Sequence, residues 1–315
     1  MDKKRRIITD ILTLALVAMM VGLAESLGEK EIIFPEITAM AIGAWVAPQQ
    51  IWRTNRLRIV LLIAIFAVLG VLLVRYLPLP FYLQVLVAFV IVSVGFLLSG
   101  TTFAPVISAM VLPVLLGTTS WVYPLAATVM ALIIVIVQWV LERMGLYPHY
   151  DFSPLPAPGK QKWLALGKRI VIVAALAALA LGVDFKFCIA PPLLVAFTEL
   201  SAPHSPARQR PLLVVLLITG CAVVGVLSRF CLSVWLGWPL AVSAVLATAL
   251  MLWAKRSLQM YLPPAGAIGI LAMLIPQTEL WLYPLEILLG SSLLVICALV
   301  FFRDKKQRQD QISCC

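Results

Sequence analysis

Carboxylates inside apolar stretches are the side chains of this sequence best suited to chemistry. Glu36 follows Pro35 directly, in a segment that is otherwise apolar or small. One interpretation is structural, because a carboxylate in the first turn of a helix interacts favourably with the helix dipole. The other is proton coupling, because burial disfavours the charged form of a carboxyl group. Glu199 and Glu286 also lie near segment ends, and each is open between an interfacial and a functional position.

Prolines open four short apolar segments, at Pro35, Pro105, Pro191 and Pro264. A proline costs little at a helix start, because the first amides have no partner inside the helix. A helix from Pro35 to Pro48 would rise about 20 Å, against about 30 Å of bilayer hydrocarbon. If the amino ends of such helices point to the midplane, free amides and the helix dipole would favour an anion. Short tilted helices without a ligand are the alternative.

The stretch from Tyr261 to Gly269 is the most distinctive of these segments. Pro263 and Pro264 start it, and Gly266 would let another backbone approach closely. An interrupted helix is tolerated at membrane depth where protein or a water-filled cavity surrounds it. This stretch is therefore either a kinked packing helix or part of a transport pathway.

We expect a substrate pathway shaped by prolines and glycine and supplied with carboxylates and hydroxyl donors. Its residues are Pro35, Glu36, Thr38, Thr101, Thr102, Pro105, Ser108, Pro191, Thr198, Glu199, Pro263, Pro264 and Gly266. Basic loops hold Arg53, Arg56, Arg208 and Arg210. These arginines either gather anions at the inner mouth or act only as topology signals.

The composition requires a membrane to position these residues. Only 12% of the residues are charged, 63% are hydrophobic and the mean hydropathy is +1.05. These values are typical of an all-α polytopic membrane protein. Apolar windows predict twelve segments, at 7–27, 32–48, 58–77, 81–100, 103–117, 121–141, 169–184, 187–202, 211–232, 236–254, 262–276 and 281–301.

The net charge of +10 comes from basic residues that lie between the apolar segments. We interpret them as topology determinants and not as a nucleic-acid-binding surface. With the N-terminus inside, twenty of the 24 Lys and Arg residues fall on the cytoplasmic side of the twelve segments. We therefore expect an integral protein of a bacterial plasma membrane with both termini in the cytoplasm. Its partners would be the lipid bilayer and a small, anionic substrate, and homo-oligomerisation is left open.

The chain repeats itself. Residues 67–72 match 222–227 at five of six positions, and 121–125 match 281–285 at four of five. Six segments in each copy would start both copies on the same side, which predicts two parallel repeats. The expected organisation is a first repeat at 1–146, a proline-rich cytoplasmic linker at 147–166, and a second repeat with a basic tail at 167–315.

Other function classes have little support in the residues. Two histidines and six cysteines without a CxxC pair predict no metal site, and without a Walker motif the chain is not expected to hydrolyse ATP. We expect no cofactor and no enzymatic activity. A non-transporting component of a larger assembly is the alternative to a transporter or channel, and an intramembrane enzyme is a weaker one.

A resemblance to a known family rests on the second half. The matching residues are Pro191, Ser205-Pro206-Ala207-Arg208-Gln209-Arg210, Gly225 and Pro263-Pro264-Ala265-Gly266-Ala267. Together they resemble the HPP family of small integral membrane proteins over 187–276, and more faintly over 32–117. The family is named for His-Pro-Pro, and Leu262 stands where that histidine belongs. Some members are linked to nitrite movement in cyanobacteria and chloroplasts, so the resemblance implies a small-anion permease.

Overall fold

A computed structural model describes residues 3–203 and 205–302 of the chain. The described residues form twelve α-helices with short 3₁₀ and π-helical stretches, and no strand occurs among them. The expectation of an all-α fold is confirmed. The predicted basic tail after Phe302 lies outside the described residues.

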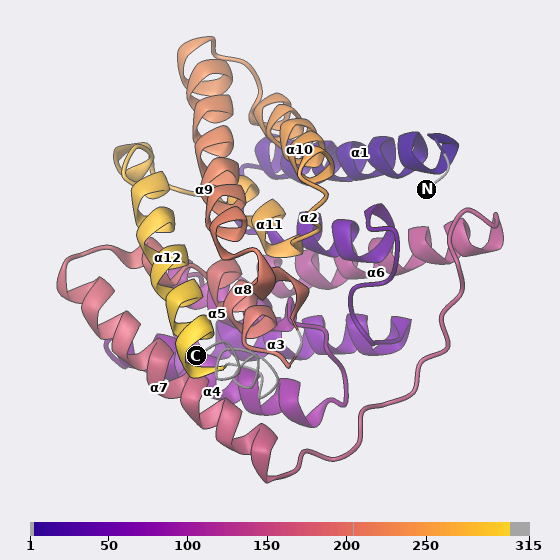
Figure 1. Ribbon diagram of the computed structural model, residues 1–315. Coiled ribbons are helices and arrows are strands. Elements are labelled where there is room, and N and C mark those ends of the chain that lie inside the picture. The colour runs from indigo at the N-terminus through magenta and orange to yellow at the C-terminus, as the bar shows by residue number, and fades with distance from the viewer. Residues whose placement is uncertain (1–2, 204, 303–315) are drawn as a thin grey trace, which may run out of the picture.

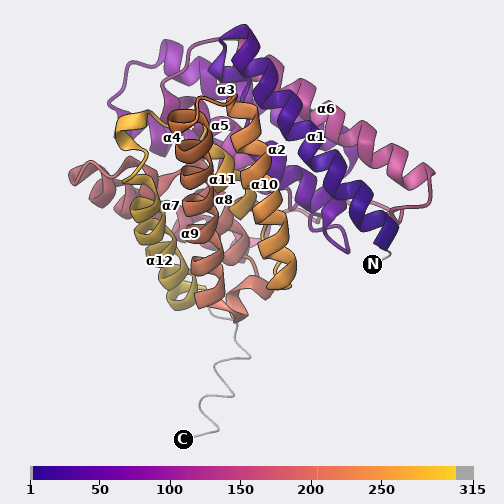
Figure 2. The same ribbon diagram turned by 90° about the horizontal axis from the view of Figure 1, so that it is seen from above.

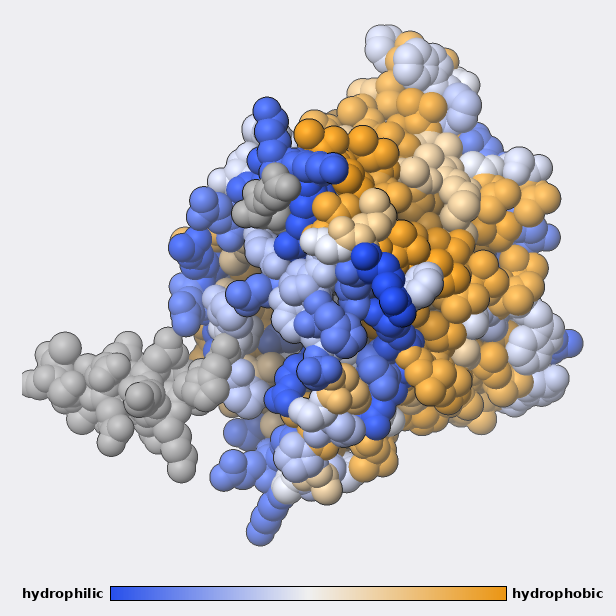
Figure 3. Space-filling view, turned by 90° about the vertical axis from the view of Figure 1, so that its right-hand side faces the viewer, coloured by the Kyte–Doolittle hydropathy of each residue, from blue (hydrophilic) through white to orange (hydrophobic). Residues whose placement is uncertain are grey.

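Eight of the described helices are long and apolar enough to cross a membrane. Between 22% and 44% of their most apolar windows is buried, so most of their surface is free to face lipid. Figure 3 shows the result as a broad hydrophobic surface beside a hydrophilic face. The eight are α1 (Lys3–Leu27), α3 (Arg56–Tyr76), α4 (Phe81–Leu98), α6 (Val122–Arg143), α7 (Lys160–Gly182), α9 (Pro211–Ser228, continued by the π-helix Arg229–Trp235), α10 (Leu240–Ser257) and α12 (Tyr283–Phe301).

Four shorter helices fill the interior. They are α2 (Glu36–Ala41, continued by the π-helix Ile42–Val46), α5 (Val106–Leu116), α8 (Pro191–Leu200) and α11 (Pro263–Leu271). Every residue of α2 and α11 is buried, as are all but one residue of α8. Each helix has a proline at its N-cap or first positions, which fixes where it starts. The twelve predicted segments thus correspond to eight long helices and four that are shorter than a membrane span.

The first and second halves of the chain are interleaved. Helix α1 packs along α10, and α7 packs against α4 (Figure 1). The α1–α10 pair is antiparallel, because Glu25 accepts a hydrogen bond from the Leu240 amide at one end and Asp10 pairs with Arg256 at the other. The short helices also meet across the halves, α2 with α11 and α5 with α8, while α8 contacts α11. Figure 2 shows α8 and α11 in the middle of the molecule, behind α9 and α10.

One end of the molecule carries Arg53, Arg56, Arg58 and Ser153, and we call this surface the basic face. The loop between α6 and α7 crosses it and contacts the start of α3 there. Arg53 donates to the Ser153 hydroxyl at 3.1 Å, and Arg58 stacks over the Phe152 ring at 4.8 Å. Helix α7 already begins at Lys160, inside the predicted linker 147–166, because Gly159 is its extended N-cap and good helix formers follow.

Candidate functional site

Glu36 begins α2 in the interior of the protein. Its side chain is fully buried, and neither carboxylate oxygen has a hydrogen-bond partner among the described residues. The Ser108 side chain of α5 lies beside the carboxylate. Its hydroxyl, like that of Thr38 one turn further along α2, is buried without a hydrogen-bond partner. Unpartnered buried polar atoms are costly. The four oxygen atoms of Glu36, Thr38 and Ser108 therefore form a candidate ligand-binding site.

Lys255 brings a buried cation to the same place. It lies in the last turn of α10, is 1% exposed, and its Nζ makes no hydrogen bond within the described chain. The Nζ atom lies against Gly266 of α11, 3.0 Å from where a Cβ would stand, and the Thr38 methyl lies 3.1 Å from that point. A Cβ here would also lie 2.8 Å from Ile42 Cδ1, so a side chain at this position would push both the isoleucine and the ammonium group aside.

Glu199 completes a set of three ionisable groups from three helices. It lies near the end of α8, is partly exposed, and accepts a hydrogen bond of 2.8 Å from the Trp52 indole. Glu36, Glu199 and Lys255 lie near enough to one another to interact electrostatically. We call these three residues the charge cluster. It combines a positive charge with two carboxylates in an interior that penalises any net charge.

The amides at the starts of the short helices are paired. The Ile37 amide donates to Phe34 O at 3.0 Å, Ser108 to Pro105 O at 3.1 Å, Leu193 to Ala190 O at 2.8 Å and Ala265 to Leu262 O at 3.2 Å. These four amides are therefore not free, so they do not provide the anion site that was predicted at the starts of the short helices. Around Glu36, the buried donors without a hydrogen-bond partner among the described residues are the Lys255 ammonium and the hydroxyls of Thr38 and Ser108.

Several residues expected along a pathway have local partners instead. Thr101 shares a hydrogen bond of 2.8 Å with Ser99, and the Thr102 hydroxyl accepts from the Arg53 amide at 2.8 Å. Thr198 donates back to Leu194 O within α8 at 2.9 Å. The five prolines shape the helix starts around the cluster without contributing polar atoms to it.

Glu286 also lies apart from the charge cluster. Its carboxylate accepts a hydrogen bond of 2.6 Å from the Phe187 amide. This bond fixes the loop before α8 to the first turn of α12 and gives Glu286 a structural role.

A cavity of about 290 Å³ opens on the basic face. Gln50, Thr54, Ile59 and Gln138 line both this cavity and a smaller one of about 10 Å³ behind it, which has room for about one water molecule. The Trp52 side chain lines the smaller cavity and is the residue bonded to Glu199. The two cavities therefore adjoin each other, and Trp52 lies between the smaller one and Glu199; no charge-cluster residue lines either cavity.

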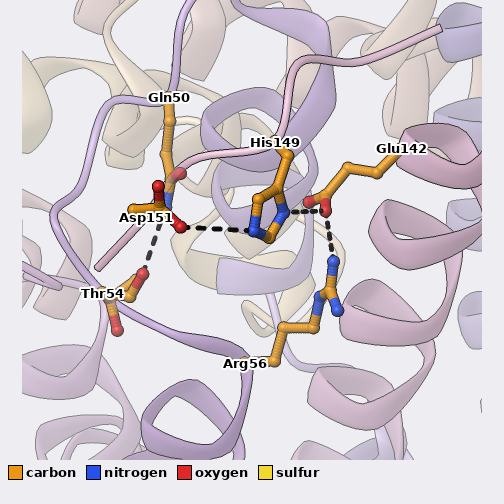
Figure 4. A network of polar contacts seen from close by, with 6 residues as sticks. All are labelled: Gln50, Thr54, Arg56, Glu142, His149 and Asp151. Carbon is orange, nitrogen blue, oxygen red and sulfur yellow. Dashed lines mark hydrogen bonds and ion pairs between the residues drawn. The ribbon is translucent and has the colours of Figure 1, made fainter. Parts of the chain in front are cut away.

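The mouth of the larger cavity holds a polar network (Figure 4). Arg56 forms an ion pair with Glu142, and His149 Nδ1 lies 3.0 Å from Glu142 Oε2. His149 Nε2 lies 3.6 Å from Asp151 Oδ1. Arg56 is thus the one predicted basic-loop residue that lines the cavity.

The other three basic-loop residues lie away from that mouth. Arg53 contacts Ser153, Arg208 donates to Phe302 O, and Arg210 is exposed before α9. Outside the membrane-spanning helices, burial raises the pKa of Tyr147, which keeps its phenol neutral beneath the Arg5 guanidinium.

Lys255 is the cluster residue that the sequence interpretation missed, because we counted it among the loop charges that set topology. The sequence does contain a pattern that predicts burial of Lys255. Ala247, Met251 and Lys255 are spaced by four residues, and all three are buried on one face of α10. The helical periodicity of the apolar segment therefore continues through Lys255 and places its side chain inside.

Comparison with known proteins identifies the second half of the chain. The family model described as HPP, transmembrane region, matches residues 156–310, which include α7 to α12 and two of the three charge-cluster residues. No curated protein and no solved structure matches the chain. The resemblance noted in Pro191, the loop at 205–210 and the segment from Pro263 is thereby confirmed. Through residues 156–310 this chain belongs to the HPP family of integral membrane proteins.

Proposed function

We propose that the protein is a transporter for a small monovalent anion, with the charge cluster as its binding site. The observation that carries this proposal is Lys255, a buried ammonium group without a hydrogen-bond partner, beside the free hydroxyls of Thr38 and Ser108. The ammonium group can only donate hydrogen bonds, and each hydroxyl can donate one. This set of donors suits an anion such as nitrite, nitrate or formate. The family resemblance supports nitrite as the first candidate.

The closed state of the cluster supports a carrier. Glu36 is 0% and Lys255 is 1% exposed, so solvent does not reach either group in this conformation. Transport then requires movement of the short helices, and the small residues at the α2–α11 contact would permit it.

Matched contacts support two copies of one unit around this site. Tyr123 donates to Ala109 O at 2.9 Å in the first half, and Tyr283 donates to Ile268 O at 2.6 Å in the second. Each tyrosine ring also packs edge-on against a phenylalanine, Phe34 in one half and Phe187 in the other. We propose that the halves are six-segment repeats, and that the excess of Lys and Arg makes the basic face cytoplasmic.

Anion flux in proteoliposomes tests the function. Purified wild-type protein should take up nitrite, nitrate or formate saturably, and Lys255→Met should lose this flux. Lys168→Met is the matched control, because Lys168 is exposed on α7 and should be dispensable. Protein-free vesicles correct for diffusion of nitrous or formic acid. Flux that is not saturable, or that survives in Lys255→Met, would contradict the proposal.

A further inference from the structure

The charges of the buried cluster make a specific form of coupling possible. Two carboxyl groups and one ammonium group carry a net charge of −1 when all are ionised. A net charge in an enclosed interior is strongly unfavourable, so one carboxyl group should be protonated in the empty protein. The titratable groups that face the cluster from neighbouring helices, Tyr123 on α6 and Cys221 on α9, add no charge as a phenol and a thiol.

The surroundings distinguish the two carboxyl groups. Glu36 is fully buried, and beside its carboxylate lies, among the described residues, only the neutral Ser108 hydroxyl of α5, so burial favours its protonated form. Glu199 is partly exposed and receives the Trp52 N–H, which favours its carboxylate form. We therefore take ionised Glu199 to balance the Lys255 charge in the empty protein, although the two groups interact electrostatically without forming a direct ion pair. Glu199 is also bonded to Trp52, which lines the smaller cavity.

The Lys255–Glu199 pair is incomplete, because the Lys255 Nζ makes no hydrogen bond. The ammonium group can therefore accept another anion as its partner. We propose that Glu199 and the transported anion compete for Lys255, so that each monovalent anion that binds there brings one proton onto Glu199. This inference rests on the proposed function and adds the coupling ion and its stoichiometry.

The balance of charge is the same in both states. The empty cluster holds protonated Glu36, ionised Glu199 and the Lys255 ammonium, with a net charge of zero. The occupied cluster holds two protonated carboxyl groups, the ammonium and the anion, again with a net charge of zero. Anion and proton would enter from one side and leave together on the other, so transport moves no net charge. A divalent anion cannot be neutralised in this way, because the fully protonated cluster carries only one positive charge.

Binding calorimetry measures the protons taken up. Nitrate and nitrite are titrated into the purified full-length protein in two buffers of different ionisation enthalpy. We expect about one proton per bound anion and no binding of sulfate. Glu36→Gln should leave the stoichiometry unchanged, because an amide resembles the protonated acid. In Glu199→Gln, Glu36 can replace Glu199 as the counter-ion and take up the proton. In the double variant Glu36→Gln/Glu199→Gln the anion is the only counter-ion of Lys255, so it should bind more tightly and with no proton uptake.

The outcomes separate the two proposals. Anion binding with no proton uptake in the wild-type protein would overturn the coupling and leave the transporter proposal standing. Loss of proton uptake in Glu36→Gln but not in Glu199→Gln would overturn the assignment to Glu199. No binding of any monovalent anion would overturn the proposed function and this inference with it. The wild-type stoichiometry decides the coupling even if a variant fails to fold.

Flux measurements give an independent check. In proteoliposomes whose membrane potential is clamped with potassium and valinomycin, wild-type nitrate uptake should follow the pH gradient and ignore the potential. In the double variant Glu36→Gln/Glu199→Gln the same uptake should follow the potential and ignore the pH gradient. Potential-driven uptake by the wild-type protein would overturn electroneutral coupling.

Discussion

The indole Nε1 of Trp52 donates a hydrogen bond of 2.8 Å to Oε1 of Glu199. The bond joins the loop after α2 to the end of α8 and so links the two halves of the chain. The Trp52 ring lies edge-on to Phe103, with centroids 5.3 Å apart, and occupies the space that the absent side chain of Gly43 leaves. Trp52 thus separates the charge cluster from the cavity on the basic face.

Replacing Trp52 with phenylalanine keeps an aromatic ring against Phe103 and removes the donor to Glu199. Loss of a hydrogen bond to a charged group should lower the stability by about 1–3 kcal/mol. Thermal unfolding in detergent measures this change. Flux should lose part of its dependence on the pH gradient, because the indole no longer favours ionised Glu199. Trp253→Phe, on the exposed face of α10, is the control, and equal behaviour of the two variants would remove the role assigned to the bond.

Lys255→Met should separate stability from function. Methionine is similar in length, and Glu199 can take up a proton once its counter-ion is gone. No unpaired charge then stays buried, so the unfolding temperature should change little at a pH where Glu199 is protonated. Anion flux should fall by at least about tenfold, which corresponds to the loss of about 1.4 kcal/mol of binding free energy. A large fall in the unfolding temperature would instead show that Lys255 stabilises the fold.

Two glycines should be equally intolerant of substitution if the halves are built alike. A Cβ on Gly70 of α3 would lie 2.6 Å from Met110 O of α5, and a Cβ on Gly225 of α9 would meet Gly269 O of α11. Gly70→Ala and Gly225→Ala should each cost about 1–3 kcal/mol, because the helices must move apart.

The matched control for these glycines is Gly220→Ala. Gly220 is exposed on α9 and has no atom near its Cβ position, so alanine there should stabilise the helix by about 0.5–1 kcal/mol. Thermal unfolding of the three variants measures the pattern. Tolerance of alanine at only one of the two positions, Gly70 or Gly225, would show that the two halves pack differently.

Thiol accessibility should distinguish the open cavity on the basic face from the buried interior. In a background without the six native cysteines, Gln50→Cys should react readily with a small water-soluble thiol reagent, because Gln50 lines the open cavity. Ala265→Cys should react slowly in the empty protein, since Ala265 is 0% exposed, and faster while anion is being transported. Complete protection of Ala265→Cys during transport would place the pathway elsewhere.

The start of each short helix could be predicted from sequence, because proline both fixes the backbone and removes a donor. Glu36, Thr38, Ser108, Glu199 and Gly266 were expected along one pathway, and the structure brings these five residues together. Their role in transport stays a prediction. Thr101 and Thr102 show the limit of the method, because a hydroxyl in a short segment can equally well satisfy its own loop.

The neighbours of the long helices could not be predicted. An apolar helix that faces lipid on most sides does not encode its partner in a periodic pattern, because lipid and protein favour the same residues. Only single polar contacts fix the choice, such as Asp10 with Arg256 and Glu25 with the Leu240 amide. Each of these pairs spans most of the chain, so neither residue alone points to the other.

The interleaving of the halves bears on how the protein is made. Helix α1 leaves the ribosome first, yet its main partner, α10, is among the last segments to be synthesised. Helix α4 likewise lacks α7 until the loop after α6 has been translated. The first half must therefore wait in the bilayer with incomplete contacts, and α1 packs against α2 and its flanking turns but lacks its main partner. Two fragments cut between α6 and α7 should be unstable when expressed singly and should assemble when expressed together.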